Sequence, residues 1–248
     1  MAKNTFTSLS TRAPKSLDKE KTKDKTSSML EEISELQNLL FAESKHSLLV
    51  LIQGMDGSGK DGLIRDVFTS MNPQGVMVKS WKAPTPEELS HDFLWRIHEH
   101  APAKGMIAIH NRSHYEDVLV TRVHGWIDDS LAKKRFQAIN QFEDILSTHN
   151  QTHILKFYLH ISHEEQIARL NERMELPEKM WKYNENDLKE SQLWDTYMKY
   201  YQEAFAQCNA IPWNIIPADQ NWYKNFLVAE KLLESMKAMK MKFPGLKK

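Results

Sequence analysis

Short apolar runs alternate along the chain with segments in which apolar residues recur every three or four positions. The runs are rich in Val, Ile and Leu, as is typical of buried strands, and cover residues 48–53, 75–81, 105–110, 153–161 and 212–218. Helical spacing separates and follows them, over residues 59–71, 86–101, 115–124, 128–149 and 221–239. Strands that alternate with helices form parallel sheets covered on both faces. The pattern therefore predicts an α/β fold with about five parallel strands.

Two segments precede the first predicted strand. Residues 29–45 place apolar side chains near helical spacing, which predicts an amphipathic helix. Residues 1–28 are polar and highly charged, so we expect a flexible polar arm there. The remaining chain, residues 29–248, is expected to form a single domain, because a chain of this length can bury one large core.

The stretch GMDGSGKDG, residues 54–62, stands between the first predicted strand and the next helix. Its spacing of Gly, four residues and Gly-Lys is that of a Walker A phosphate-binding loop, and the strand before it and helix after it are the required context. Backbone N–H groups of such a loop bind phosphate oxygens, and the lysine neutralises charge during phosphate transfer. The competing explanation is a glycine-rich turn with a surface lysine. We predict phosphate binding at Gly54, Gly57, Gly59 and Lys60.

Acidic residues lie in and near this loop. Asp56 is inside it, and Asp61 takes the position where a Ser or Thr usually holds Mg²⁺. Asn111 follows the third strand, where a metal-binding Asp is usual, and Glu116 and Asp117 come one helical turn later. A metal ion between carboxylates and phosphates would explain the acids, so we predict Mg²⁺, with Mn²⁺ as the alternative, at Asp56 and Asp117. Glu116 could replace Asp117, and Asp61 could simply favour the first turn of its helix.

Basic residues gather at the same edge of the predicted sheet. Lys82 follows the second strand, Arg112 ends the third, and Arg122 lies on the next helix. Open α/β sheets bind ligands at the carboxyl ends of their strands. The cluster therefore favours an anion site, although charged helix faces are usually only solvated.

Residues 163–208 interrupt the alternation of strands and helices. The segment is helical in pattern and rich in Arg, Lys, Glu and Trp. An insertion of this kind beside a phosphate-binding loop predicts a helical lid. Within it, Arg169 and Arg173 are four residues apart and share one helix face.

Composition narrows the choice of partners. Lys+Arg and Asp+Glu number 33 each, so no global field favours polyanions, and we expect no nucleic-acid partner. No apolar run approaches the ~20 residues of a membrane span, and the first residues lack the apolar segment of a signal peptide. Cys208 is the only cysteine, which fits a reducing compartment, and we expect a cytoplasmic protein.

Five stretches stand in the order of the motifs of the polyphosphate kinase 2 family: GMDGSGKDG, SWKAPTPEELSHDFLWRIH, NRSHYEDVLVTRVH, PEKMWKYNENDLKESQLWDTY and PWNIIPADQNWY. The chain resembles that family from about residue 29 to 230. The resemblance implies a nucleotide-kinase-like phosphate-loop fold and a reversible, Mg²⁺-dependent phosphotransferase. Such an enzyme moves the terminal phosphate of inorganic polyphosphate to AMP or ADP, giving ADP or ATP. Asn111 stands where other subgroups of the family carry Asp. In this the chain resembles the class III subgroup, which acts on both AMP and ADP. The resemblance also implies a homo-oligomer, and guanine nucleotides are further candidate acceptors.

The resemblance also assigns roles to residues. The catalytic set that it implies is Asp56, Lys60, Arg112, Arg122 and Arg173. It also implies substrate binding by Asn111, Glu116 and Arg169, and the loop and strand-end patterns add Gly54, Gly57, Gly59, Asp61 and Lys82 to that set. It does not decide whether Arg169 or Arg173 contacts the transferred phosphate. Two alternatives stay open: an ATP-dependent nucleoside monophosphate kinase of the same fold, and a non-catalytic polyanion- or nucleotide-binding protein.

Overall fold

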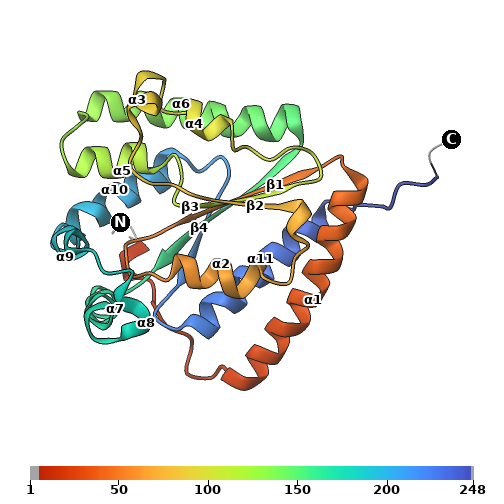
Figure 1. The fold of residues 1–248 in the computed structure, drawn as a ribbon, viewed down its shortest axis with the longest axis horizontal. Helices are drawn as coiled ribbons and strands as arrows, with labels where there is room; N and C mark the ends of the chain where they lie inside the picture. Colours follow the sequence, from red (N-terminus) through yellow and green to blue (C-terminus); the bar gives the residue numbers. More distant parts are fainter. Residues whose placement is uncertain (1–5, 247–248) are drawn as a thin grey trace, which may run out of the picture.

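A parallel five-stranded sheet forms the centre of the protein, in the order β2-β3-β1-β4-β5 (Figure 1). The computed structural model describes residues 6–246. The strands are β1 (Ser47–Gln53), β2 (Val76–Ser80), β3 (Ile107–Asn111), β4 (Thr152–His160) and β5 (Trp213–Pro217). All neighbouring pairs are parallel, and every residue of the central β1 is buried, as its continuous apolar run requires. The predicted α/β fold is confirmed.

Helices cover both faces of the sheet. On one side lie α1 (Lys19–Glu43), α2 (Lys60–Phe68) and α11 (Asn221–Ala238), and on the other lie α5 (Glu116–Val123), α6 (Asp129–Asn150) and α10 (Trp194–Gln207) (Figure 1). Short 3-10 turns occur at Phe6–Ser8 and Pro73–Gly75. Among the described residues, no helix is both long and apolar enough to cross a membrane.

The helix expected over residues 86–101 is divided into α3 (Pro86–Ser90) and α4 (Trp95–His98). His91 adopts an extended backbone, with φ −105° and ψ 175°. Asp92 then begins a new turn: its side chain accepts from Leu94 N at 2.9 Å, and its carbonyl oxygen accepts from Trp95 N. The short aspartate side chain thus competes with the helical hydrogen bonds that an uninterrupted helix would need.

The first long helix begins about ten residues before its predicted start. Asp18 caps α1 by accepting from Lys21 N at 2.9 Å. Thr22 and Thr26 lie on its buried face and satisfy their hydroxyl groups on carbonyl oxygens four residues back. Polar residues can therefore continue a buried helix face without an apolar pattern. Residues 6–13 also contact the domain, through Phe6, Leu9, Thr11 and Ala13, which differs from the arm expected over residues 1–28. Residues 1–5 lie outside the described chain.

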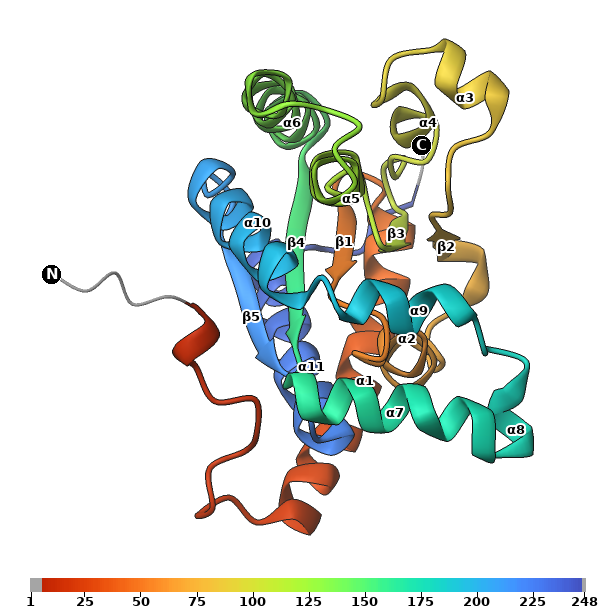
Figure 2. The same ribbon diagram turned by 90° about the vertical axis from the view of Figure 1, so that its left-hand side faces the viewer.

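The predicted lid segment contains α7 (His163–Glu175), α8 (Pro177–Met180), α9 (Glu185–Ser191) and α10. In Figure 2, α7 and α9 lie beside α2, α8 stands at the far end of α7, and β4 runs into α7 at this end of the sheet. Helix α10 differs, because it buries Tyr197, Tyr201 and Ala204 in the main core. Only α7–α9 therefore extend over the carboxyl ends of the strands, and these three helices are called the lid helices below.

Candidate active site

The loop between β1 and α2 has the geometry that its glycines predict. Gly57 and Gly59 have φ values of 85° and 87°, where a residue with a Cβ would be strained. Lys60, the first residue of α2, is 7% exposed and turns back over the loop. Its Nζ donates to the carbonyl oxygen of Gly54 at 2.7 Å and to that of Met55 at 3.1 Å. Burial lowers the pKa of Lys60, and the neighbouring Asp56 opposes this.

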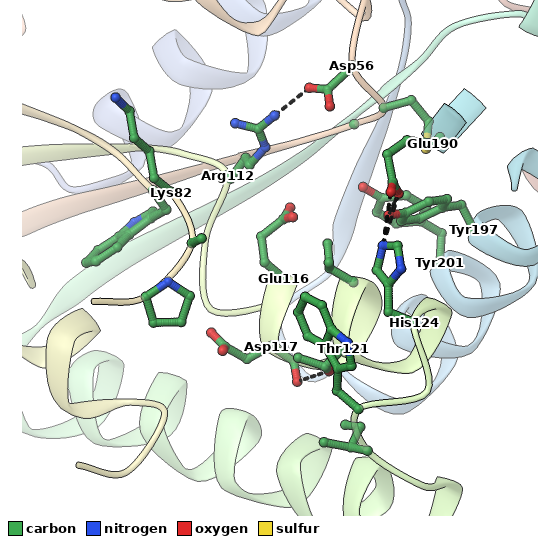
Figure 3. A pocket seen from close by; sticks show the side chains of 18 of the residues that line it. Asp56, Lys82, Arg112, Glu116, Asp117, Thr121, His124, Glu190, Tyr197 and Tyr201 are labelled. Atoms are coloured by element: carbon green, nitrogen blue, oxygen red, sulfur yellow. Dashed lines mark hydrogen bonds and ion pairs between the residues drawn. The ribbon is translucent and has the colours of Figure 1, made fainter. Parts of the chain in front are cut away.

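Asp56 meets Arg112, which follows the last residue of β3 (Figure 3). Arg112 Nη2 donates to Asp56 Oδ1 at 2.5 Å, and Lys60 Nζ lies 3.6 Å from the same oxygen. Burial raises the pKa of Asp56, but Lys60 and Arg112 outweigh it and hold this pKa below its usual value. Arg112 has φ 63°, a left-handed conformation that costs energy without glycine, and its N–H donates to Ile52 O at 2.9 Å. The fold thus holds the carboxylate of Asp56 and the guanidinium of Arg112 next to each other.

Asn111 and Asp61 form a second contact beside the loop. Asn111 Nδ2 donates to Asp61 Oδ1 at 2.7 Å, and Lys182 Nζ donates to Asp61 Oδ2 at 3.2 Å. Burial raises the pKa of Asp61, and the bonds from Asn111 and Lys182 more than offset it, so the pKa is lowered. Asn111 Oδ1 is buried and has no hydrogen-bond partner among the described residues. Asp61, on α2, therefore contacts both β3 and the turn between α8 and α9.

Glu116 and Asp117 lie differently although they are neighbours on α5. Figure 3 shows Glu116 extending toward Arg112, with Asp117 farther from Asp56. Burial raises the pKa of Glu116, against the opposing charges of Arg112 and Lys60. Asp117 instead accepts from Arg96 Nη2 at 3.3 Å. The predicted metal pair of Asp56 and Asp117 is therefore not the closest arrangement of acids. Within residues 6–246, no three His, Cys, Asp or Glu side chains are grouped as a metal site.

Two pockets meet at Asp56 and Arg112, which line both. The first, about 750 Å³ in volume, has mainly apolar walls and is called the apolar pocket; they include Trp81, Pro84, Leu89, Val120, Trp126 and Ile127. The second, about 810 Å³, lies between the loop and the lid helices and is called the basic groove; its cations include Lys60, Arg65, Arg169, Arg173, Lys179, Lys182 and Lys224. The protein therefore joins an apolar compartment to a strongly charged one.

The two lid arginines have different surroundings. Arg169 donates to the carbonyl oxygens of Gly57 at 3.1 Å and of Ala218 and Asp219 at 2.9 Å each, and to Glu165 at 2.9 Å. These bonds tie α7 to the phosphate-binding loop. Arg173, one turn farther along, pairs with Asp187 and contributes to lowering the pKa of Asp56. Arg169 is thus anchored by the backbone, whereas Arg173 faces the charges of the groove.

Arg122 does not join the other predicted residues. Its Nη1 donates to Glu203 at 2.8 Å, its Nη2 donates to Asp129 at 2.6 Å, and its guanidinium lies 4.0 Å from the ring centroid of Tyr200. It follows Glu116 by six residues, which is about 240° around the helix, and it lines neither pocket. This placement corrects the expectation that Arg122 faces the site: it links α5 to α6 and α10.

The remaining residues lie at the pocket walls. Lys82 is exposed at the edge of the apolar pocket rather than in the groove, and its carbonyl oxygen accepts from Arg96 at 3.0 Å. Sequence reasoning missed Gln166, whose Nε2 donates to Asp56 O at 2.9 Å, and Glu190, which accepts from Tyr197 at 2.6 Å. Both come from the lid segment, where polar residues on a helix carry no signal of the face they present.

Known proteins resemble this chain over most of its length. The family model for polyphosphate kinase 2 (PPK2) matches residues 16–244. An AMP/ADP-polyphosphate phosphotransferase of Meiothermus ruber is 47% identical over 214 residues, covering 86% of this chain and 80% of the relative. An ADP-polyphosphate phosphotransferase of Rhodopseudomonas palustris is 41% identical over 229 residues, covering 87% and 79%. The crystal structure of polyphosphate kinase 2 from Arthrobacter aurescens TC1 has a TM-score of 0.95, with 38% identity, and covers 100% of this chain and 90% of that one.

Proposed function

The chain belongs to the polyphosphate kinase 2 family, and we propose that it moves the terminal phosphate of inorganic polyphosphate to AMP and ADP. The main structural support is that the apolar pocket and the basic groove meet at Asp56 and Arg112, so that one can hold the acceptor and the other the donor. The basic groove suits a polyanion, since each phosphate needs a cation beside it. The apolar pocket suits a nucleotide, whose base stacks on apolar walls. Transfer then takes place where the two compartments join.

The proposed chemistry needs positioning and charge neutralisation. A terminal oxygen of the acceptor phosphate attacks the terminal phosphorus of polyphosphate, and the bond from that phosphorus to its bridging oxygen breaks. The acceptor is already an anion, so no protein base has to remove a proton. Charge spread over the transferred group requires fixed cations, which Lys60, Arg112 and Arg173 supply. Arg169 holds α7 in place beside them.

Mg²⁺ is part of this proposal. Asp56 and Glu116 offer only oxygen atoms, the donors that Mg²⁺ prefers, and the ion usually takes one or two carboxylates plus phosphates and water. A site without a third carboxylate therefore fits Mg²⁺. Bound between the substrates, the ion would neutralise phosphate oxygens. Mn²⁺ accepts the same donors. Asp117 is the weaker candidate, because it lies farther from Asp56 than Glu116 does (Figure 3).

Removing one metal-binding carboxylate should change the requirement for Mg²⁺. We expect Asp56→Asn and Glu116→Gln to need several-fold more Mg²⁺ for half-maximal activity and to recover partly when it is supplied. Asp117→Asn is the matched control and should keep the wild-type Mg²⁺ dependence. Initial rates measured over a Mg²⁺ series test this. A shift in the Asp117 variant with none in the Glu116 variant would restore the pair predicted from sequence.

We expect the two lid arginines to have different roles: Arg173 acts in phosphate transfer, and Arg169 anchors α7. Arg173→Ala is expected to lower kcat on the order of 10²-fold with little change in melting temperature, because a cation facing the transferred phosphate is lost. Arg169→Ala should instead weaken the attachment of α7, which raises KM for polyphosphate and lowers the melting temperature. Steady-state kinetics and thermal melts of both variants give the comparison. Equal losses of kcat in the two variants would contradict separate roles for Arg169 and Arg173.

The proposed function is tested by changing the phosphate donor. AMP is supplied with either polyphosphate or ATP as the sole donor, and ADP formation is measured. We expect polyphosphate to support turnover far better than ATP. The opposite ranking would favour a nucleoside monophosphate kinase, and no turnover with either donor would favour a binding protein. Use of guanine nucleotides, a homo-oligomeric state and a cytoplasmic location stay predictions; GDP as acceptor and a measured solution mass test the first two.

A further inference from the structure

Residues 6–13, called the N-terminal strap below, lie against the main domain rather than apart from it. Phe6 is 6% exposed and packs edge-on against Tyr158 and Phe205, with ring centroids 5.2 and 5.0 Å away. Its N–H donates to Gln202 Oε1 at 3.1 Å. Leu9 O lies 3.2 Å from His160 Nε2. One end of the strap is therefore fixed on β4 and α10.

The other end of the strap meets Asp219, which follows β5. Thr11 Oγ1 donates to Asp219 Oδ2 at 2.8 Å, and Asp219 N donates to Thr11 O at 3.1 Å. The carboxylate is 3% exposed, and Arg12 Nη1 lies 3.7 Å from Oδ2. A buried carboxylate needs donors to replace water. The strap supplies one such donor, the hydroxyl group of Thr11, and the nearby cation of Arg12.

Asp219 also holds the start of α7. Its Oδ1 accepts from Ser162 N at 2.8 Å and its Oδ2 accepts from Ser162 Oγ at 3.1 Å. Ser162 is the N-cap of α7 and accepts from Glu165 N at 3.2 Å. The backbone oxygen of Asp219 accepts from Arg169, which in turn donates to Gly57 O. A continuous set of contacts therefore runs from the strap through Asp219 to α7 and the phosphate-binding loop.

We propose that the N-terminal strap is a positioning element that holds α7 over the basic groove through Thr11 and Asp219. The strap lies outside residues 16–244, which the family model matches, and no step of the phosphate transfer uses it. Without Thr11, Asp219 loses a donor and bonds Ser162 from a less restrained position. Helix α7 then moves away from the basic groove more often, and Arg173 lies at the groove in a smaller fraction of the molecules. The kinetic part of this proposal rests on the proposed function, whereas the structural part does not.

The test compares Thr11→Val, which removes the hydroxyl at nearly constant shape, with Phe6→Ala, which loosens the far end of the strap. Lys15→Ala is the matched control, because Lys15 is exposed and two residues beyond the strap. Hydrogen exchange is followed by mass spectrometry in α7 and in β1, in the full-length protein. We expect exchange in α7 to accelerate on the order of tenfold in Thr11→Val, with protection of β1 and the control unchanged. KM for polyphosphate should rise several-fold, and KM for AMP should stay constant.

Unchanged exchange of α7 in both strap variants would overturn the proposal. So would equal acceleration in α7 and β1, since the strap would then act only on global stability. Faster exchange of α7 with an unchanged KM for polyphosphate would reject its role in substrate binding. If the wild-type protein does not use polyphosphate at all, the proposed function fails, and the exchange data still decide the structural part.

Discussion

Replacing Lys60 with alanine is expected to lower kcat on the order of 10²–10³-fold, as when one donor to a transition-state charge is removed. Lys60 Nζ is held over the loop by the carbonyl oxygens of Gly54 and Met55 and lies 3.6 Å from Asp56. The cation is therefore positioned before substrate binds. The measurement is kcat with saturating ADP and polyphosphate.

Folding of the Lys60 variant should be preserved, because Arg112 still neutralises Asp56. The matched control is Lys45→Ala, an exposed lysine just before β1, at the amino end of that strand. Thermal melts establish that both variants are folded. Near-normal turnover in a folded Lys60→Ala protein would contradict the role of this loop in transfer.

Arg112→Ala should produce the second large loss, again on the order of 10²-fold or more in kcat. Among residues 6–246, Arg112 is the one arginine that lines both pockets, and its position depends on a left-handed backbone that the fold enforces. Alanine loses the charge where acceptor and donor phosphates meet. A lysine at this position would keep the charge but not the planar group that binds two oxygens at once, so it should recover only part of the activity.

Arg122→Ala is the matched control for Arg112. Arg122 bonds Glu203 and Asp129 away from the pockets, so its loss should reduce the free energy of unfolding by about 2 kcal/mol and leave most of kcat. Kinetics and denaturant unfolding should therefore show a large loss of kcat in Arg112→Ala and mainly a loss of stability in Arg122→Ala. A large loss of kcat in a well-folded Arg122 variant would return that residue to the active site.

The sheet could be predicted because its inner strands β1 and β3 are buried throughout, and the partly exposed edge strands β2 and β5 still carry short apolar runs. The phosphate-binding loop could be predicted because its glycines and lysine stand between such a strand and a helix. Helix boundaries were harder to predict where a polar side chain decides them. Asp92 divides one expected helix, and the hydroxyl bonds of Thr22 and Thr26 extend another into a polar stretch.

Most of the candidate residues line the two pockets, but the sequence did not predict their orientation and did not indicate Gln166 or Glu190. Sequence spacing placed Glu116, Asp117 and Arg122 on one helix, yet their directions depend on what packs around it. Arg96 comes from the α4 segment to pair with Asp117, and Glu203 comes from α10 to pair with Arg122. These partners are distant in sequence, so a single sequence carries no record of the pairing. The same holds for Arg169, three of whose acceptors are backbone oxygens distant in sequence.

We propose that acceptor and donor occupy separate pockets, which are joined at Asp56 and Arg112. The most direct measurement is KM for ADP and KM for polyphosphate in two variants, each altered in one pocket only. Trp126, 69% exposed, lines the apolar pocket, and Lys179 lines the basic groove. We predict that Trp126→Ala raises KM for ADP at least about threefold, the loss expected for a stacking contact, with KM for polyphosphate unchanged. Lys179→Ala should do the reverse. A shift of the same KM in both variants, or the opposite assignment, would contradict the two-pocket account.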